Sequence, residues 1–117
     1  MTAGTGTSDA AAKIAARLTE LWQTSRPTIL ERMTALHAAC DALTRHPADT
    51  GARASGREAA HKLSGVLGVF GLPQGSELAS AIEFQLESDQ PLNAEDLAAL
   101  RRNLAALDAV IASKDTA

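Results

Sequence analysis

Hydrophobic residues recur every three to four positions along most of this chain, the spacing that places them on one face of an α-helix. No stretch shows the residue-by-residue alternation of a half-buried β-strand. The helical spacing occurs in five segments: one at 10–23, one from Pro27, one around 57–71, one from Pro73 and one after Asn93. Because the connections are short, the pattern predicts an all-α fold, an antiparallel four-helix bundle with an additional N-terminal helix packed on it as an extension.

The first segment is expected to begin at Asp9, whose carboxylate suits a helix N-cap. The eight residues before it are small and polar, so we expect residues 1–8 to form a flexible N-terminal tail and residues 9–114 to form the bundle domain. The helix after Asp9 carries one apolar stripe that we expect to pack in the core: Ile14, Leu18, Leu21 and Trp22.

A second helix is predicted from Pro27, because proline is tolerated in the first turn of a helix. Its apolar stripe consists of Ile29, Met33, Leu36, Cys40 and Leu43. A loop with a proline and a glycine at residues 45–52 ends it. The start of the next helix stays open, since Thr50 is one candidate N-cap and Ser55, with Glu58 three residues later, forms a capping box.

Two further breaks divide the C-terminal half of the chain. Gly71 is expected to end one helix and Pro73 to begin the next, whose stripe is Leu78, Ile82 and Leu86. Asn93 is the predicted N-cap of the last helix, and Glu95 and Asp96 complement the positive end of its dipole. The apolar seam of that helix is Leu97, Leu100, Leu104, Leu107 and Ile111.

Composition limits the classes of function. With 117 residues, 45% hydrophobic and 21% charged, the chain fits one globular domain. A formal net charge of -3 and the lack of a Lys/Arg block argue against nucleic-acid binding. Cys40 is the only cysteine, which argues against a Cys-based zinc cluster and fits a reducing cytoplasm. With no signal-peptide pattern and no bilayer-length apolar run, we expect a soluble, cytoplasmic, monomeric protein that does not bind membranes.

One predicted helix face contains glycine where this alanine-rich chain would be expected to use alanine. On a helical wheel Gly65 and Gly68 lie within about 40° of His61. Arg57 and Ser64 flank His61 within about 60°, and the opposite side is apolar: Ala59, Leu63, Val66, Leu67 and Phe70. Each glycine inside a helix costs on the order of 1 kcal/mol relative to alanine. Bare backbone beside a nucleophilic imidazole allows another macromolecule to approach, which would compensate for this cost.

The stretch "AHKLSG" at residues 60–65 resembles the motif of the histidine-containing phosphotransfer (HPt) domains of two-component phosphorelays. That family's pattern continues with a glycine ten residues after the histidine and a Leu/Ile–Glu/Gln pair near the end of the next helix. The matching positions are Ala60, His61, Leu63, Gly65, Gly71, Ile82 and Glu83. The resemblance implies that His61 is the phosphoacceptor. It also implies that Glu83, on the antiparallel neighbouring helix, accepts a hydrogen bond from Nδ1 of the imidazole and leaves Nε2 free.

Two positions depart from the family's pattern. Ser64 stands where the family usually has lysine, so the positive charge that steadies the phosphate must come from elsewhere. Lys62 lies about 100° around the helix from His61, which leaves Arg57 as the cation on the correct face. Gly75 replaces the family's usual leucine, and we expect it to loosen the start of its helix. The surface expected to bind a partner contains Arg57, Lys62, Ser64, Gly65 and Gly68.

The sequence has no glycine-rich nucleotide loop, so we interpret the chain as a phosphocarrier without kinase activity of its own. The resemblance implies response-regulator receiver domains as partners, with a hybrid histidine kinase as a further candidate. It implies no cofactor in this chain, and the Mg²⁺ needed for transfer would belong to the receiver.

Two other hypotheses remain. A helical interaction module could bind a receiver or a partner helix through the glycine face without any transfer. A metal or haem site is disfavoured, because no second His or Cys is spaced to join His61 on one helical face. We interpret His37 and His46 as structural or solvent-exposed, and Cys40 as a small core residue.

Overall fold

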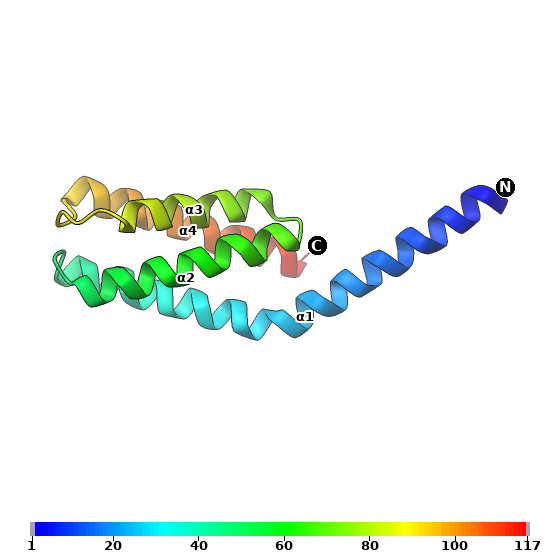
Figure 1. The fold of residues 1–117 in the computed structure, drawn as a ribbon, viewed down its shortest axis with the longest axis horizontal. Coiled ribbons are helices and arrows are strands. Elements are labelled where there is room, and N and C mark those ends of the chain that lie inside the picture. The colour runs from blue at the N-terminus through cyan, green and yellow to red at the C-terminus, as the bar shows by residue number, and fades with distance from the viewer. Residues whose placement is uncertain (1, 117) are drawn as a thin grey trace.

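The computed structural model describes the backbone of residues 2–116 and the side chains of residues 9–115. Over this range the chain forms four helices and no strand: α1 (Thr2–Arg45), α2 (Thr50–Val69), α3 (Pro73–Leu86) and α4 (Ala94–Thr116). Each helix packs against the next, and α1 also contacts α4, so the four close into a bundle (Figure 1). The predicted all-α fold is confirmed.

The two N-terminal segments predicted as separate helices form one continuous helix, α1, and this corrects the expected additional helix. Pro27 lies inside α1 rather than at a helix start, and Asp9 is likewise interior and caps nothing. An interior proline removes one backbone hydrogen bond and favours a bend. Figure 1 shows α1 changing direction where it leaves the end of the bundle. The prediction of a flexible tail stays untested, because the side chains of residues 1–8 lie outside the described part.

The ends of the other helices follow local chemistry. Asp49, rather than either residue considered from the sequence, caps α2, and its carboxylate accepts a hydrogen bond from the Ala52 backbone N–H at 3.0 Å. Gly71 takes a positive φ of 69°, which glycine adopts without strain, and allows the turn into α3. Asn93 and Asp96 cap α4 reciprocally, each side chain accepting from the other's backbone N–H. The caps expected at Gly71 and Asn93 are confirmed.

The bundle core contains the stripes expected for its four helices. Its largest fully buried side chains are Ile29, Leu36, Leu43, Leu63, Leu67, Ile82, Leu86, Leu100 and Leu107. Two buried glycines let helices approach closely. A Cβ at Gly56 would lie 2.9 Å from Leu86 Cδ1, and one at Gly75 would lie 3.1 Å from Val110 Cγ1. Gly75 therefore permits tight packing of α3 against its neighbours, and the expectation that it loosens α3 is wrong.

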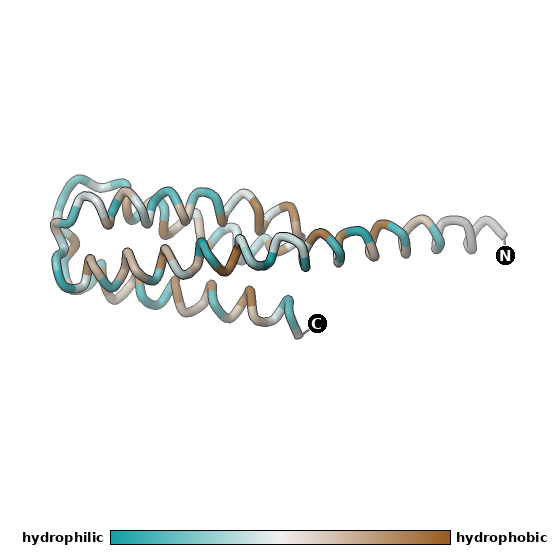
Figure 2. The backbone as a smooth tube through the Cα atoms, turned by 90° about the horizontal axis from the view of Figure 1, so that it is seen from below, coloured by the Kyte–Doolittle hydropathy of each residue, from teal (hydrophilic) through white to brown (hydrophobic). Residues whose placement is uncertain are grey.

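The N-terminal stripe does not pack in the core as expected. Trp22 is buried, but Ile14, Leu18 and Leu21 are 62%, 40% and 36% exposed. They lie on the part of α1 that projects past the end of the bundle, where Figure 2 shows hydrophobic positions continuing along the tube. The periodicity identified an apolar face correctly, but no other described helix extends far enough to cover it.

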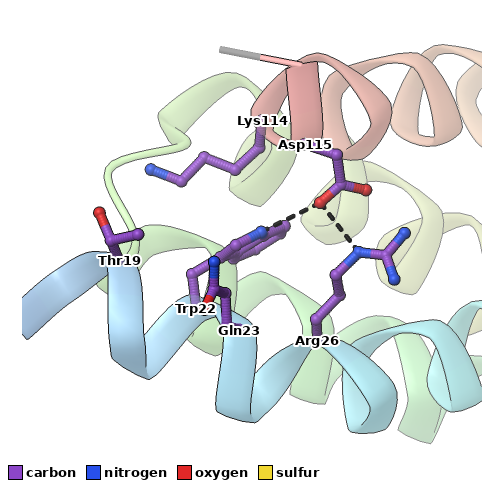
Figure 3. Close-up of a pocket in the computed structure, with 6 residues that line it drawn as sticks. All are labelled: Thr19, Trp22, Gln23, Arg26, Lys114 and Asp115. Atoms are coloured by element: carbon purple, nitrogen blue, oxygen red, sulfur yellow. Dashed lines mark hydrogen bonds and ion pairs between the residues drawn. The ribbon is translucent and has the colours of Figure 1, made fainter.

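Trp22 fixes the junction at which α1 leaves the bundle. Its ring packs edge-on against Phe70, with the centroids 5.3 Å apart. The carboxylate of Asp115, near the end of α4, accepts hydrogen bonds from the Trp22 indole N–H at 3.1 Å and from Arg26 Nε at 2.9 Å (Figure 3). The Arg26 guanidinium holds the pKa of the Asp115 carboxyl below its usual range. These side chains line a hollow of about 580 Å³ and satisfy one another's polar groups, so they form a structural clamp.

Candidate functional site

His61 and Glu83 lie side by side on neighbouring helices. The distance between His61 Nδ1, on α2, and Glu83 Oε2, on α3, is 2.9 Å. The imidazole is 72% exposed, whereas the carboxylate is partly buried between the helices. When Nδ1 carries the hydrogen and donates a hydrogen bond to this carboxylate, Nε2 keeps its lone pair. In that tautomer the site presents an unprotonated Nε2 on an open surface.

Packing on both helices fixes the direction of these two side chains. Ala60 and Leu63 are fully buried beside His61, so their positions turn the imidazole away from the core. Ile82 is fully buried next to Glu83 and sets the orientation of α3 in the same way. The pairing expected from the family resemblance is thus present in the structure.

The glycines beside His61 have no packing role within the described part of the chain. A Cβ at Gly65 would meet nothing within 4 Å, and one at Gly68 would meet only Ser76 Oγ, at an ordinary contact distance of 3.7 Å. This contrasts with Gly56, where a Cβ would have to displace its neighbours. The stability lost at Gly65 and Gly68 is therefore not recovered by close packing within the described chain.

Ser64 stands at the position where the family usually has lysine, and it brings no positive charge to the site. Its hydroxyl donates to the backbone carbonyl of His61 at 2.8 Å. Ser76 on α3 donates in turn to the Ser64 carbonyl at 2.7 Å, a contact that the sequence analysis missed. The sequence does contain one indication of this contact: Ser76 lies seven residues before Glu83, which places both on one face of α3. Ser64 and Ser76 thus link α2 to α3 beside the site.

The two candidate cations, Lys62 and Arg57, differ in whether they have an ion-pair partner among the described residues. Lys62 Nζ lies 2.9 Å from Glu58 Oε1, and this ammonium holds the pKa of the Glu58 carboxyl below its usual range. Arg57 makes no hydrogen bond or ion pair with any described residue. It lines an open hollow of about 450 Å³ together with Glu58, His61 and Glu83. Arg57 is therefore the cation with a free guanidinium next to the imidazole.

A scan of the chain against protein-family models matches the Hpt domain over residues 9–110. The chain belongs to the Hpt domain family. Hpt domains serve as phosphocarriers in two-component phosphorelays and interact with response-regulator receiver domains and with kinases. The resemblance drawn from "AHKLSG" is confirmed at the level of the family. No curated protein and no solved structure matches the chain.

This Hpt domain has a second histidine–carboxylate pair, between α1 and α4. His37 Nε2 lies 2.9 Å and 3.1 Å from the two carboxylate oxygens of Asp108. Cys40, one turn along α1, is buried as expected, and burial raises the pKa of its thiol to about 11, with a further contribution from Asp41. Nothing in the sequence signalled the pair, because Asp108 comes from a helix 71 residues further along the chain.

Two kinds of site are not found among the described residues of this Hpt domain. No group of three or more His, Cys, Asp or Glu side chains lies close enough together to hold a metal ion. In the same part of the chain, no helix is both long and apolar enough to cross a membrane.

Proposed function

We propose that this Hpt domain accepts a phosphoryl group on Nε2 of His61 from the aspartyl phosphate of one receiver domain and passes it to the aspartate of another. The observation that carries the proposal is the 2.9 Å contact between His61 Nδ1 and Glu83, which leaves Nε2 on the exposed side of the ring. An imidazole oriented in this way is a nucleophile near neutral pH.

The transfer needs no change in the protonation of the ring. The Nε2 lone pair attacks phosphorus, the bond between phosphorus and the aspartate oxygen breaks, and the electron pair leaves with the aspartate carboxylate. Nδ1 keeps its hydrogen, so the phosphorylated ring is positively charged and lies against the Glu83 carboxylate. Glu83 therefore orients the ring before transfer and stabilises its charge afterwards. The second transfer reverses these steps toward another aspartate.

Arg57 supplies the positive charge that lysine usually supplies in this family. It is four residues before His61 on the same face of α2 and has no partner among the described residues, whereas Lys62 is engaged with Glu58. A guanidinium can donate two parallel hydrogen bonds to phosphoryl oxygens. Gly65 and Gly68 leave room for the receiver, and Lys62 and Ser64 complete the surface that it covers.

The remaining parts of the reaction belong to the partner. The receiver holds the Mg²⁺ that offsets charge on the moving phosphoryl group. This chain needs no cofactor and has no kinase activity, and residues 9–114 act as one phosphocarrier domain in the cytoplasm. A hybrid histidine kinase is a further source of phosphoryl groups for the relay.

One observation favours a second candidate function, a module that binds receivers without transfer. Ser64 carries no charge, and its hydroxyl is directed to the His61 backbone carbonyl. In that case the glycine face would bind a receiver, and His61 would be dispensable.

Phosphate incorporation tests the proposal. A panel of purified, radiolabelled phospho-receiver domains is mixed with the wild-type chain, with His61→Gln and with His37→Gln, each shown to be helical by circular dichroism. We expect acid-labile, alkali-stable label on the wild type and on His37→Gln, and none on His61→Gln. Label on His61→Gln, or a wild type that binds a receiver but never becomes labelled, would contradict phosphotransfer at His61. The latter outcome would support the binding module.

A further inference from the structure

The part of α1 that projects past the bundle bears an apolar stripe that no described residue covers. Ile14, Leu18 and Leu21 form this stripe, which we call the overhang stripe, and they are spaced four and three residues apart. Exposed Ile and Leu side chains in a row mark an interaction surface more often than scattered ones do.

Helical phase shows which way the overhang stripe faces. Leu18 lies four residues before Trp22, one turn earlier on the same side of α1, and Leu21 directly precedes Trp22. The Trp22 ring packs against Phe70 at the end of α2. The overhang stripe therefore continues the side of α1 that packs on α2.

The exposed face of α2 leads toward the same end of the molecule. His61, Gly65 and Val69 follow one another at intervals of four residues, and Val69 is 70% exposed. Val69 immediately precedes Phe70, whose ring packs against Trp22 where α1 leaves the bundle. The line that starts at His61 thus ends beside the base of the overhang stripe, as the course of the two helices in Figure 1 indicates.

The dimensions favour one partner that covers both surfaces. From His61 to Val69 is about 12 Å along α2, and from Trp22 back to Ile14 is a further 12 Å or so along α1. A globular domain of 100 to 150 residues is about 35 Å across, so one such domain can span both parts. Among the described residues, the three side chains of the overhang stripe alone offer far less than the roughly 800 Å² per partner of a stable interface, which argues against pairing with a second copy through these side chains.

We propose that the overhang stripe is a second contact for the receiver domain that reaches His61. This inference rests on the proposed phosphotransfer. His61 and Arg57 act on the phosphoryl group, while Ile14, Leu18 and Leu21 bury apolar surface against the receiver and hold it on the bundle. The overhang stripe therefore sets the affinity of the encounter and leaves the chemical step unchanged.

The test measures the rate of phosphotransfer against receiver concentration, using whichever receiver labels the wild type. The variant is the double substitution Ile14→Glu with Leu18→Glu, in which glutamate keeps the helix propensity high. Leu30→Glu is the matched control. Leu30 is 37% exposed and directly follows Ile29, which is buried in the bundle core, so a glutamate there adds the same charge to α1 away from the overhang stripe. Circular dichroism checks that all three proteins fold.

We expect the double variant to need at least tenfold more receiver for half-maximal rate, with the saturating rate within twofold of the wild type, and Leu30→Glu to change neither by more than twofold. An unchanged half-saturating concentration in the double variant would overturn the inference while leaving phosphotransfer intact.

Sedimentation of the proteins without receiver supplies the other decisive result. A wild-type dimer that the double variant converts to a monomer would assign the overhang stripe to a second copy. A wild type that neither binds nor labels with any receiver would overturn both proposals.

Discussion

Two histidine–carboxylate pairs of the same length occur in this molecule, and they present opposite nitrogens. At the α2–α3 pair, the Glu83 carboxylate contacts Nδ1 of His61 and leaves Nε2 exposed. At the α1–α4 pair, both oxygens of Asp108 lie against Nε2 of His37, the nitrogen that points away from the backbone. A contact of 2.9 Å between a histidine and a carboxylate can thus leave either ring nitrogen uncovered.

The turn that follows each histidine differs as well. Four residues after His61 stands Gly65, where an added Cβ would meet nothing within 4 Å. Four residues after His37 stands Asp41, which brings a side chain and a negative charge to that position. The His61 imidazole is 72% exposed and the His37 imidazole 46%, so the first ring is the more accessible of the two. Side chains of both signs lie beside the second pair, since Asp41 and Arg101 line the same hollow as His37.

The largest expected effect concerns the hollow of about 140 Å³ that His37, Cys40 and Asp108 line, which we call the α1–α4 groove. Because the pKa of Cys40 is raised from 9.0 to about 11, its thiolate at pH 8 should be about a hundredfold scarcer than in the unfolded chain. We expect iodoacetamide at pH 8 to alkylate the native protein at least a hundredfold more slowly than the protein in urea. Fast alkylation of the folded chain would show that the α1–α4 groove opens, and would weaken the contrast with His61.

The raised pKa of Cys40 also makes the free energy of unfolding depend on pH. The folded state holds the Cys40 proton to higher pH than the unfolded state does, so the stabilisation is complete below pH 9 and is lost as the pH rises toward 11. Cys40→Ala should remove this component of the alkaline loss of stability, measured by urea unfolding at several pH values.

The next effect comes from removing each carboxylate in turn. Glu83→Ala takes away the group that orients the imidazole, and we expect phosphotransfer to slow by about 10- to 100-fold. Glu83→Gln restores an acceptor for the Nδ1 proton, so the rate should recover to within severalfold of the wild type. Asp108→Ala should change the rate by less than twofold. Equal losses in Glu83→Ala and Asp108→Ala would mean that the two pairs act through stability alone.

A smaller effect is expected from filling the space after His61. Gly65→Gln gives this turn a side chain, as Asp41 does after His37, and should slow transfer about tenfold. Gly65→Ala should raise the free energy of unfolding by about 0.5–1 kcal/mol, because its Cβ meets no neighbour. Gly56→Ala is the control, and should lower that free energy by about 1–3 kcal/mol, since its Cβ would lie 2.9 Å from Leu86 Cδ1. Urea unfolding of Gly65→Ala that shows no gain would contradict an open glycine face.

Local signals predicted the bundle well, because periodicity and capping act over a few residues. The stripes of the bundle helices, the helix end at Gly71 and the N-cap at Asn93 all follow from neighbours within one or two turns. The His61–Glu83 pairing depended on recognising a family motif, and the structure places the two side chains in contact. Their roles in phosphotransfer stay proposals that the experiments above test.

The errors arose where a neighbouring helix decides the outcome. Pro27 is an ordinary signal for a helix start, but it cannot show whether the preceding helix continues through it. The stripe at Ile14 and Leu18 has a core-like period although no described helix reaches it. Glycine at position 75 predicts a loose helix start, but side chains of α2 and α4 pack closely against it. These contacts join residues that are distant in the chain, and a pattern along the chain contains no information about them.

Trp22 has a practical consequence for studying this protein. The chain contains one tryptophan and no tyrosine, so nearly all of its near-ultraviolet absorption and emission comes from a single indole. That indole touches the end of α2, donates a hydrogen bond to the end of α4 and sits under the Lys114 ammonium, 5.9 Å from the ring centre. Its fluorescence spectrum therefore reports, without an added label, whether α1 and α4 remain packed together at this end of the bundle.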